Sequence, residues 1–288
     1  MNTKTISLIS FFIFVLTFFS CSQKKEIELE DYKGLITSLV NSCEQTIARN
    51  NNLVKDINAI RTKMILMTYD PQSRKTSLEM IPLFKKANLK TNQIDDLLLN
   101  TLNEIINKEE GINNWLKKNS VTQTTSYDSF YRLKKIDSPK WTTKMLGVDS
   151  EESINRAENL RVSLLNYRDE LILAIADSVI NYKNQLQIIT IENLSSFEGF
   201  KSYLEKIDHL NKFELLEIYE ELTFPKEIPF SDKNILWNQK VFQNQPLIGA
   251  ISTLNYYRNK IRIAQLLGAK TFWSRIDKPL KPLYEYQE

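Results

Sequence analysis

Apolar residues recur every three or four positions along most of this 288-residue chain, which is the spacing of one face of an α-helix. Glycine is scarce: only 6 residues, against an average share of about 7% in soluble proteins. Turn-dense sandwiches and barrels need more glycine than this. The sequence therefore predicts an all-α fold, an elongated bundle of about five or six helices.

Turn signals divide the helical pattern. Asp70-Pro71 ends the first long helix, and Gly111 ends the second. Asp149 and Glu152 resemble a capping box at the start of the third, and Pro82 is expected in the first turn of the second helix or at a kink. Long helices are expected over 30–68, 78–109, 149–182 and 246–276, with short pieces near 196–207, 213–222 and 232–242 and a loop around Pro225 and Pro229.

Residues 111–148 have little helical periodicity. The segment contains a Ser/Thr-rich stretch, Pro139 and Gly147, but also Trp115, Tyr127 and Trp141, and such aromatic side chains bury large areas. We expect one long irregular connection that packs across the bundle. Loops of this length are uncommon in compact domains unless they are functional.

The N-terminus has the pattern of a lipoprotein signal. Lys4 precedes an apolar run that ends at Phe19, and the small residue Ser20 stands directly before Cys21. The run is shorter than the roughly 20 residues that span a bilayer. We expect residues 1–20 to be removed, Cys21 to be lipidated, residues 21–29 to form a tether, and residues 278–288 to form a tail. An ordinary signal peptide with a chance cysteine and an uncleaved anchor are the alternatives.

Charge and cysteine content restrict the partners. The net charge of +3 is close to neutral, and the lysine pairs are scattered, so nucleic acid is not an expected partner. If Cys21 is lipidated, Cys43 has no partner for an intramolecular disulfide. Cys43 falls on an apolar helical stripe, where a small buried side chain is a more common role than a reactive thiol.

The residue inventory disfavours an enzyme. His209 is the only histidine, which excludes multi-histidine metal sites, and neither a phosphate-binding glycine loop nor a nucleophile motif is present. Adjacent carboxylates on a helix point in different directions; only Glu217 and Glu221, four apart, share a face, and nearby lysines offer them ion-pair partners. All of the pairs are therefore expected on solvated faces. We predict no catalytic residues, no metal and no cofactor. The pairs are Asp95-Asp96, Glu109-Glu110 and Glu217 with Glu221.

A polar stripe interrupts the last long helix. Asn255, Asn259 and Arg262 stand at positions i, i+4 and i+7, and Arg262 offers a rigid fork of donors for a carboxylate or for helix-terminal carbonyls. The stripe is either a binding site or, as we favour, an intradomain clamp that fixes loop 223–232 or the 111–148 connection. Trp237 and Phe242 are expected first of all as core anchors.

Residues 237–277 resemble the N-terminal domain of the gliding-motility GldM family of Bacteroidetes, which belongs to the gliding and type IX secretion motor. The resemblance is carried by spaced positions, none catalytic, and extends over most of residues 28–277. Asn255, Arg258 and Gln265 stand where the family pattern has Ser, Gln and Glu. The matching positions are Trp237, Phe242, Pro246, Leu254, Asn259 and Arg262.

The resemblance implies a helical interaction domain and a possible homodimer. Together with the signal, it predicts a non-enzymatic lipoprotein of the cell envelope, on the periplasmic face or at the cell surface, held on a membrane by the lipid on Cys21. Its expected partners are envelope proteins, with a link to gliding motility or type IX secretion. The alternative is a lipoprotein that binds a small molecule or glycan in a helical groove lined by aromatic side chains near Trp115, Tyr127 or Trp141.

Overall fold

The computed structural model describes residues 29–183, 189–206, 211–231 and 233–277. Within them the chain is 75% helix and 6% strand, which confirms the all-α prediction at the level of fold class. Eight α-helices and two small sheets are present in these ranges, more than the five or six helices expected. The signal and tether, Cys21, His209 and the C-terminal tail lie outside the described residues.

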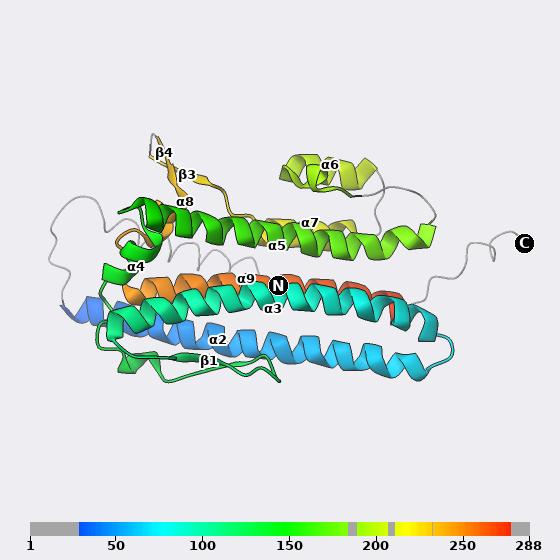
Figure 1. Cartoon of the computed structure of the whole chain (residues 1–288), viewed down its shortest axis with the longest axis horizontal. Coiled ribbons are helices and arrows are strands. Elements are labelled where there is room, and N and C mark those ends of the chain that lie inside the picture. Colours follow the sequence, from blue (N-terminus) through cyan, green and yellow to red (C-terminus); the bar gives the residue numbers. More distant parts are fainter. Residues whose placement is uncertain (1–28, 184–188, 207–210, 232, 278–288) are drawn as a thin grey trace, which may run out of the picture.

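Three long helices form the lower part of the bundle in Figure 1: α2 (Leu29–Leu66), α3 (Arg74–Glu110) and α9 (Leu247–Asp277). Helix α9 packs against both α2 and α3. The C-terminal helix of the domain therefore lies beside its two N-terminal helices. The predicted helical stripes face this contact. Its fully buried side chains include Val40, Ile47, Leu98, Leu102, Leu254 and Ile261.

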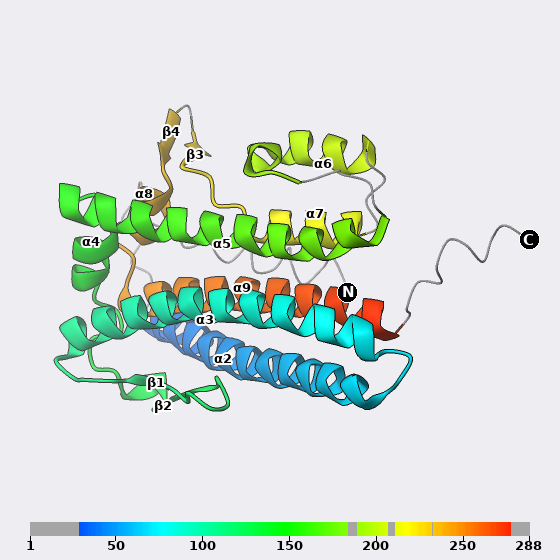
Figure 2. The same cartoon turned by 45° about the vertical axis from the view of Figure 1, so that its right-hand side comes forward.

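A second layer covers the first, as the turned view in Figure 2 makes clear. Helix α5 (Glu151–Lys183) packs on α3, and α7 (Lys212–Glu221) contacts both α5 and α9. A 3₁₀ turn (Ile191–Leu194) and α6 (Phe197–Lys206) lie above α7. Phe200 stacks on Tyr219 with ring centroids 5.5 Å apart, which fastens α6 to α7.

The 111–148 connection is more regular than predicted. It contains β1 (Leu116–Lys118) paired antiparallel with β2 (Thr125–Tyr127), a 3₁₀ turn (Phe130–Arg132) and α4 (Lys140–Leu146). Two asparagines hold this hairpin on the bundle by acting as strand partners. Asn103 of α3 bonds the backbone N–H and carbonyl of Leu116 at 2.8 and 2.7 Å, and Asn51 of α2 does the same for Thr125 at 2.8 and 2.9 Å.

Two predicted helix starts are corrected. Helix α3 begins at Arg74, four residues before the expected start, so Pro82 lies within the helix and not in its first turn. The predicted end is right, because Gly111 takes the left-handed conformation (φ 70°) that closes the helix. At α5 the capping residue is Ser150, whose hydroxyl accepts the Ser153 N–H at 3.1 Å, whereas Asp149 bonds Gln243.

The segment before α9 also differs from the prediction. In place of a loop around Pro229 and a helix from residue 232, strands β3 (Glu227–Phe230) and β4 (Lys233–Leu236) form an antiparallel hairpin. Helix α8 (Trp237–Phe242) follows directly. The hairpin projects from the end of the bundle in Figure 1, and its strand residues are exposed or half-buried. The segment therefore has no buried stripe that its sequence pattern could reveal.

The described residues contain no helix that is both long enough and apolar enough to cross a membrane.

Candidate interaction groove and the buried network

Trp237 and Phe242, the aromatic residues of the motif that resembles the GldM family, belong to an aromatic cluster in the core. Trp237 and Phe242 of α8 are buried, with ring centroids 5.4 Å apart in an edge-to-face arrangement, and Trp237 also stacks on Tyr257 of α9 at 5.9 Å. Pro246 stands one residue before α9 and its carbonyl accepts the Ala250 N–H. Leu254 is fully buried. Trp237, Phe242 and Leu254 are therefore core residues, and the stacking of Trp237 on Tyr257 anchors α8 on α9.

A charged cluster lies inside the bundle, centred on Asp95 of α3. Arg258 donates from Nε to Asp95 Oδ1 at 2.8 Å, and Arg262 donates from Nη2 to Oδ2 at 2.7 Å. All three side chains are buried. Lys118 of β1 approaches Oδ2 at 3.2 Å from the hairpin side. The expectation that Asp95 faces solvent is therefore wrong, although its neighbour Asp96 is half exposed.

The two guanidinium groups also donate to neutral acceptors. Arg258 donates to Thr125 Oγ1 of β2 at 2.8 Å and to Asn255, while Arg262 donates to Gln265 at 2.8 Å. Burial by itself would raise the pKa of the Asp95 carboxyl, but the charges of Arg258 and Arg262 reverse the effect and hold it well below its ordinary value. Asp95 is thus ionised and is contacted by cations from two elements, α9 and β1.

The polar stripe on α9 makes hydrogen bonds within the domain, as the favoured interpretation expected, but its partners are not the expected segments. Asn259 donates to Asn50 Oδ1 of α2 at 2.8 Å, and Asn50 donates to the carbonyl of Asn255. Arg262 binds α3. These bonds run to α2 and α3, not to loop 223–232. The 111–148 connection is reached instead through Arg258, which the sequence pattern did not single out.

Glu109 is a second carboxylate for which the prediction of a solvated position is wrong. It is buried, and its carboxylate accepts the backbone N–H of Trp141 at the start of α4. Glu110 accepts the backbone N–H groups of Lys134 and Lys135. The pair fixes the second half of the 111–148 connection, so it is not a solvated face.

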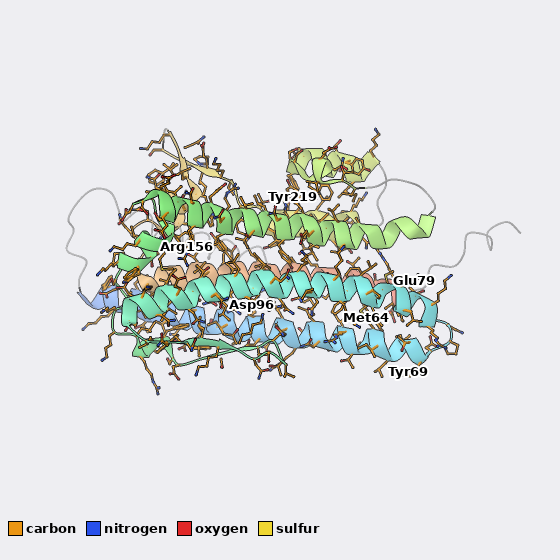
Figure 3. All side chains as sticks on the ribbon, viewed as in Figure 1. Met64, Tyr69, Glu79, Asp96, Arg156 and Tyr219 are labelled. Carbon is orange, nitrogen blue, oxygen red and sulfur yellow. The ribbon has the colours of Figure 1, made fainter. Side chains whose placement is uncertain are left out.

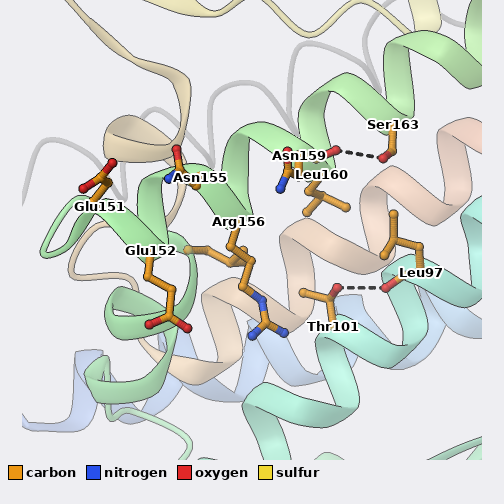
Figure 4. Close-up of a pocket in the computed structure, with 10 residues that line it drawn as sticks. Leu97, Thr101, Glu151, Glu152, Asn155, Arg156, Asn159, Leu160 and Ser163 are labelled. Atoms are coloured by element: carbon orange, nitrogen blue, oxygen red, sulfur yellow. Dashed lines mark hydrogen bonds between the residues drawn. The ribbon is translucent and has the colours of Figure 1, made fainter.

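An open groove of about 750 Å³ lies between α3 and the first half of α5. Figure 4 shows its lining side chains, with Leu97 and Thr101 contributed by α3 and residues from Glu151 to Ser163 by α5. Its floor is apolar and its rim is polar, which is the arrangement of many peptide- and ligand-binding grooves. The lining residues are Leu97, Thr101, Leu146, Glu151, Glu152, Asn155, Arg156, Asn159, Leu160 and Ser163.

The rim of this groove is acidic. Arg156 forms a two-bond ion pair with Glu104, and this hydrogen bonding lowers the pKa of the Glu104 carboxyl below its usual value. The pair neutralises the one cation of the lining. Glu151 and Glu152 make no ion pair with any described residue and lie in the first turn of α5, where the helix dipole favours negative charge.

The aromatic side chains proposed for a ligand pocket lie elsewhere. Tyr127 stacks on Phe130 with centroids 5.2 Å apart, and the Trp141 ring is flanked by the ammonium groups of Lys108 and Lys144. Neither Trp115, Tyr127 nor Trp141 lines the groove. Sequence reasoning missed the groove because its walls come from two helices whose alignment a single sequence does not reveal.

Comparison with protein-family models and with curated proteins gave no match for this chain.

Proposed function

We propose that this chain is a non-enzymatic lipoprotein of the cell envelope that acts by protein–protein interaction. A lipid on Cys21 would hold the helical domain at a membrane, on its periplasmic face or at the cell surface. The groove between α3 and α5 would receive a segment of an envelope protein. The signal pattern that ends at Cys21 supports the location, and the groove supports the mode of action.

The observation that carries the proposal is the chemistry of the groove. Leu97 is an exposed apolar side chain of the groove, above the buried Leu146 and Leu160, and the carboxylates of Glu151 and Glu152, which pair with no described cation, give the rim a negative charge. A helix or extended segment with apolar and basic side chains fits such a surface. A link to gliding motility or type IX secretion, and a homodimer, are proposed from the resemblance to the GldM N-terminal domain alone.

Cross-linking in cells tests the proposal. Leu97 lines the groove and is 38% exposed, so Leu97→Asp places a charge on the floor at little cost to folding. Val162 of α5 is 39% exposed and outside the lining, so Val162→Asp is the matched control. We expect envelope proteins that are captured by the wild type and by Val162→Asp to be lost with Leu97→Asp.

The unanchored variant Cys21→Ala separates anchoring from recognition. It should lose capture in cells but recover it when mixed with solubilised envelope proteins. Equal capture by the two aspartate variants at equal expression would exclude the groove as the binding site.

Binding of a small molecule or glycan is the second candidate, favoured by the groove volume, which lies within the usual range for ligand sites. A glycan or metabolite that raises the melting temperature of the wild type and of Val162→Asp, but not of Leu97→Asp, would establish this alternative. Under the main proposal, peptide segments of the captured proteins show this pattern of stabilisation instead, and glycans or metabolites do not.

A further inference from the structure

The turn between α2 and α3 exposes a cluster of large apolar side chains. Helix α2 is followed by a 3₁₀ turn (Met67–Tyr69), and α3 starts five residues later. Tyr69 is 82% exposed, and Leu66 and Leu78 are each more than half exposed. Figure 3 shows Tyr69 at the outer end of the helical pair, far from the groove. Helices α2 and α3 with this turn form a helical hairpin, and we call the surface at its turn the hairpin end. The hairpin end consists of Ile65, Leu66, Tyr69 and Leu78.

Basic side chains surround the hairpin end. Arg61 and Lys63 lie in the last turns of α2, and Arg74 and Lys75 in the first turn of α3; all four are exposed. Lys85 and Lys86 continue the charge along α3. None of these six cations forms an ion pair with another described residue.

Few carboxylates offset this charge. Between residues 61 and 86 the only acidic residues are Asp70 and Glu79. The carboxylate of Asp70 is engaged locally, because it accepts the Ser73 N–H at 2.9 Å before α3 begins. The surface is therefore strongly positive on a chain whose overall net charge is only +3.

We propose that the hairpin end docks on an anionic lipid membrane as a second contact beside the lipid anchor. The surface is a projecting turn with apolar side chains at its tip and cations behind them, which suits insertion into a headgroup layer better than contact with a flat protein face. Tyr69 has the amphipathic ring that is enriched at membrane interfaces. Each cation near an anionic surface contributes about fivefold in partitioning.

The docked orientation rests on the proposed lipidation of Cys21. Leu29 stands eight positions after Cys21, so an extended tether raises the start of α2 at most about 28 Å above the membrane. The 38 residues of α2 measure about 57 Å at the helical rise. With the hairpin end on the same membrane, α2 lies within about 30° of the membrane plane.

A fluorophore at the hairpin end tests the proposal. Cys43 is buried, and burial raises the pKa of its thiol to about 12, so a cysteine introduced at position 69 is labelled selectively. The full-length lipoprotein carrying Tyr69→Cys is mixed with vesicles that contain a quencher attached to the lipid tails. We expect strong quenching with vesicles of 30% phosphatidylglycerol and at least tenfold less with phosphatidylcholine alone.

The matched control is Phe213→Cys on α7, an aromatic position that is 73% exposed in the upper layer. It should remain unquenched on both vesicles. Adding Arg74→Glu and Lys75→Glu to Tyr69→Cys should reduce quenching on the anionic vesicles at least tenfold. The wild type, treated identically, gives the labelling background.

The outcomes separate this proposal from the lipid anchor. Flotation with phosphatidylcholine vesicles measures the anchor alone, whereas quenching at position 69 on anionic vesicles measures the hairpin end whether or not the protein is anchored. An unquenched label at position 69, or quenching that ignores the lipid charge and the charge reversals, overturns the proposal. Protection of the label only by added envelope proteins overturns it in favour of an acidic protein partner.

Discussion

Asp95 joins three elements of the domain. Its carboxylate belongs to α3, and its partners come from α9 and from the hairpin of the 111–148 connection. Two buried guanidinium groups face this single carboxylate, and each also donates to a neutral acceptor. The net stability from such a cluster is small, but removal of one member leaves charges buried without a partner.

Asp95→Asn should therefore destabilise the protein by about 3 kcal/mol, because Arg258 and Arg262 stay buried without an opposing charge. Urea unfolding followed by circular dichroism measures the change. Asp96→Asn, at the half-exposed neighbouring position, should change the free energy of unfolding by less than about 0.5 kcal/mol. Equal effects of the two substitutions would contradict the buried cluster.

The same carboxyl predicts how stability changes with pH. Its pKa in the folded protein lies below its value in the unfolded chain, which is about 3.9. The unfolded state then takes up a proton first as the pH falls, so the contribution of Asp95 is fully present above about pH 4 and is lost below it. The stability difference between wild type and Asp95→Asn should shrink from pH 5 to pH 2, and a constant difference would refute this assignment.

Trp237→Ala should remove a large part of the contact between α8 and α9. Truncation of a buried tryptophan costs about 3–5 kcal/mol, and for a domain of this size the melting temperature should fall by about 10 °C. Trp141→Ala, at a half-buried ring, should lower it less. An unchanged melting temperature for Trp237→Ala would remove Trp237 from the core.

At the residue scale, the sequence predicted apolar burial better than polar burial. Cys43, Trp237 and Phe242 lie in the core as expected, because a stripe of apolar residues on a helix is stabilised by facing the core. Asp95 was misplaced because acidic residues are usually exposed. A signal was present: Leu98, Leu99 and Leu102, three, four and seven residues later, place Asp95 on the buried face. Its partners, 163 and 167 residues away, could not be read from spacing.

At the scale of elements, the long helices followed from periodicity and the small strands did not. Helices α2, α3, α5 and α9 were expected within a few residues of their observed ends, because each carries a continuous buried stripe. Strands β1 and β2 are three residues long, too short for an alternating pattern. Their position depends on Asn51 and Asn103, whose side chains bond strand backbone across the fold.

Asn103→Ala should therefore loosen the β1–β2 hairpin without unfolding the helices. Loss of the side chain leaves the backbone N–H and carbonyl of Leu116 without their partners, a cost of about 1–3 kcal/mol. Hydrogen–deuterium exchange should rise in peptides that cover residues 111–130 and stay unchanged in α9. Asn100→Ala, at an exposed position one turn earlier, is the control. Unaltered exchange in the hairpin would show that Asn103 does not hold it.

At the scale of the whole molecule, the bundle places two surfaces far apart. The groove lies at the start of α5, and the hairpin end lies at the opposite end of α2 and α3. The fold class could be predicted from glycine scarcity and helical spacing, but neither surface could, because each depends on how helices align. A lipid at Cys21 would confine both surfaces to the neighbourhood of one membrane, so the proposed function depends first on that modification.

Mass spectrometry of the protein purified from native membranes tests this dependence most directly. The mature chain should begin at Cys21, and the N-terminal peptide should carry the added mass of two or more acyl chains, since one chain anchors only marginally. Cys21→Ala should abolish the modification and release the domain from the membrane fraction. An unmodified Cys21 in a freely secreted chain, or a chain that retains residues 1–20, would contradict the account.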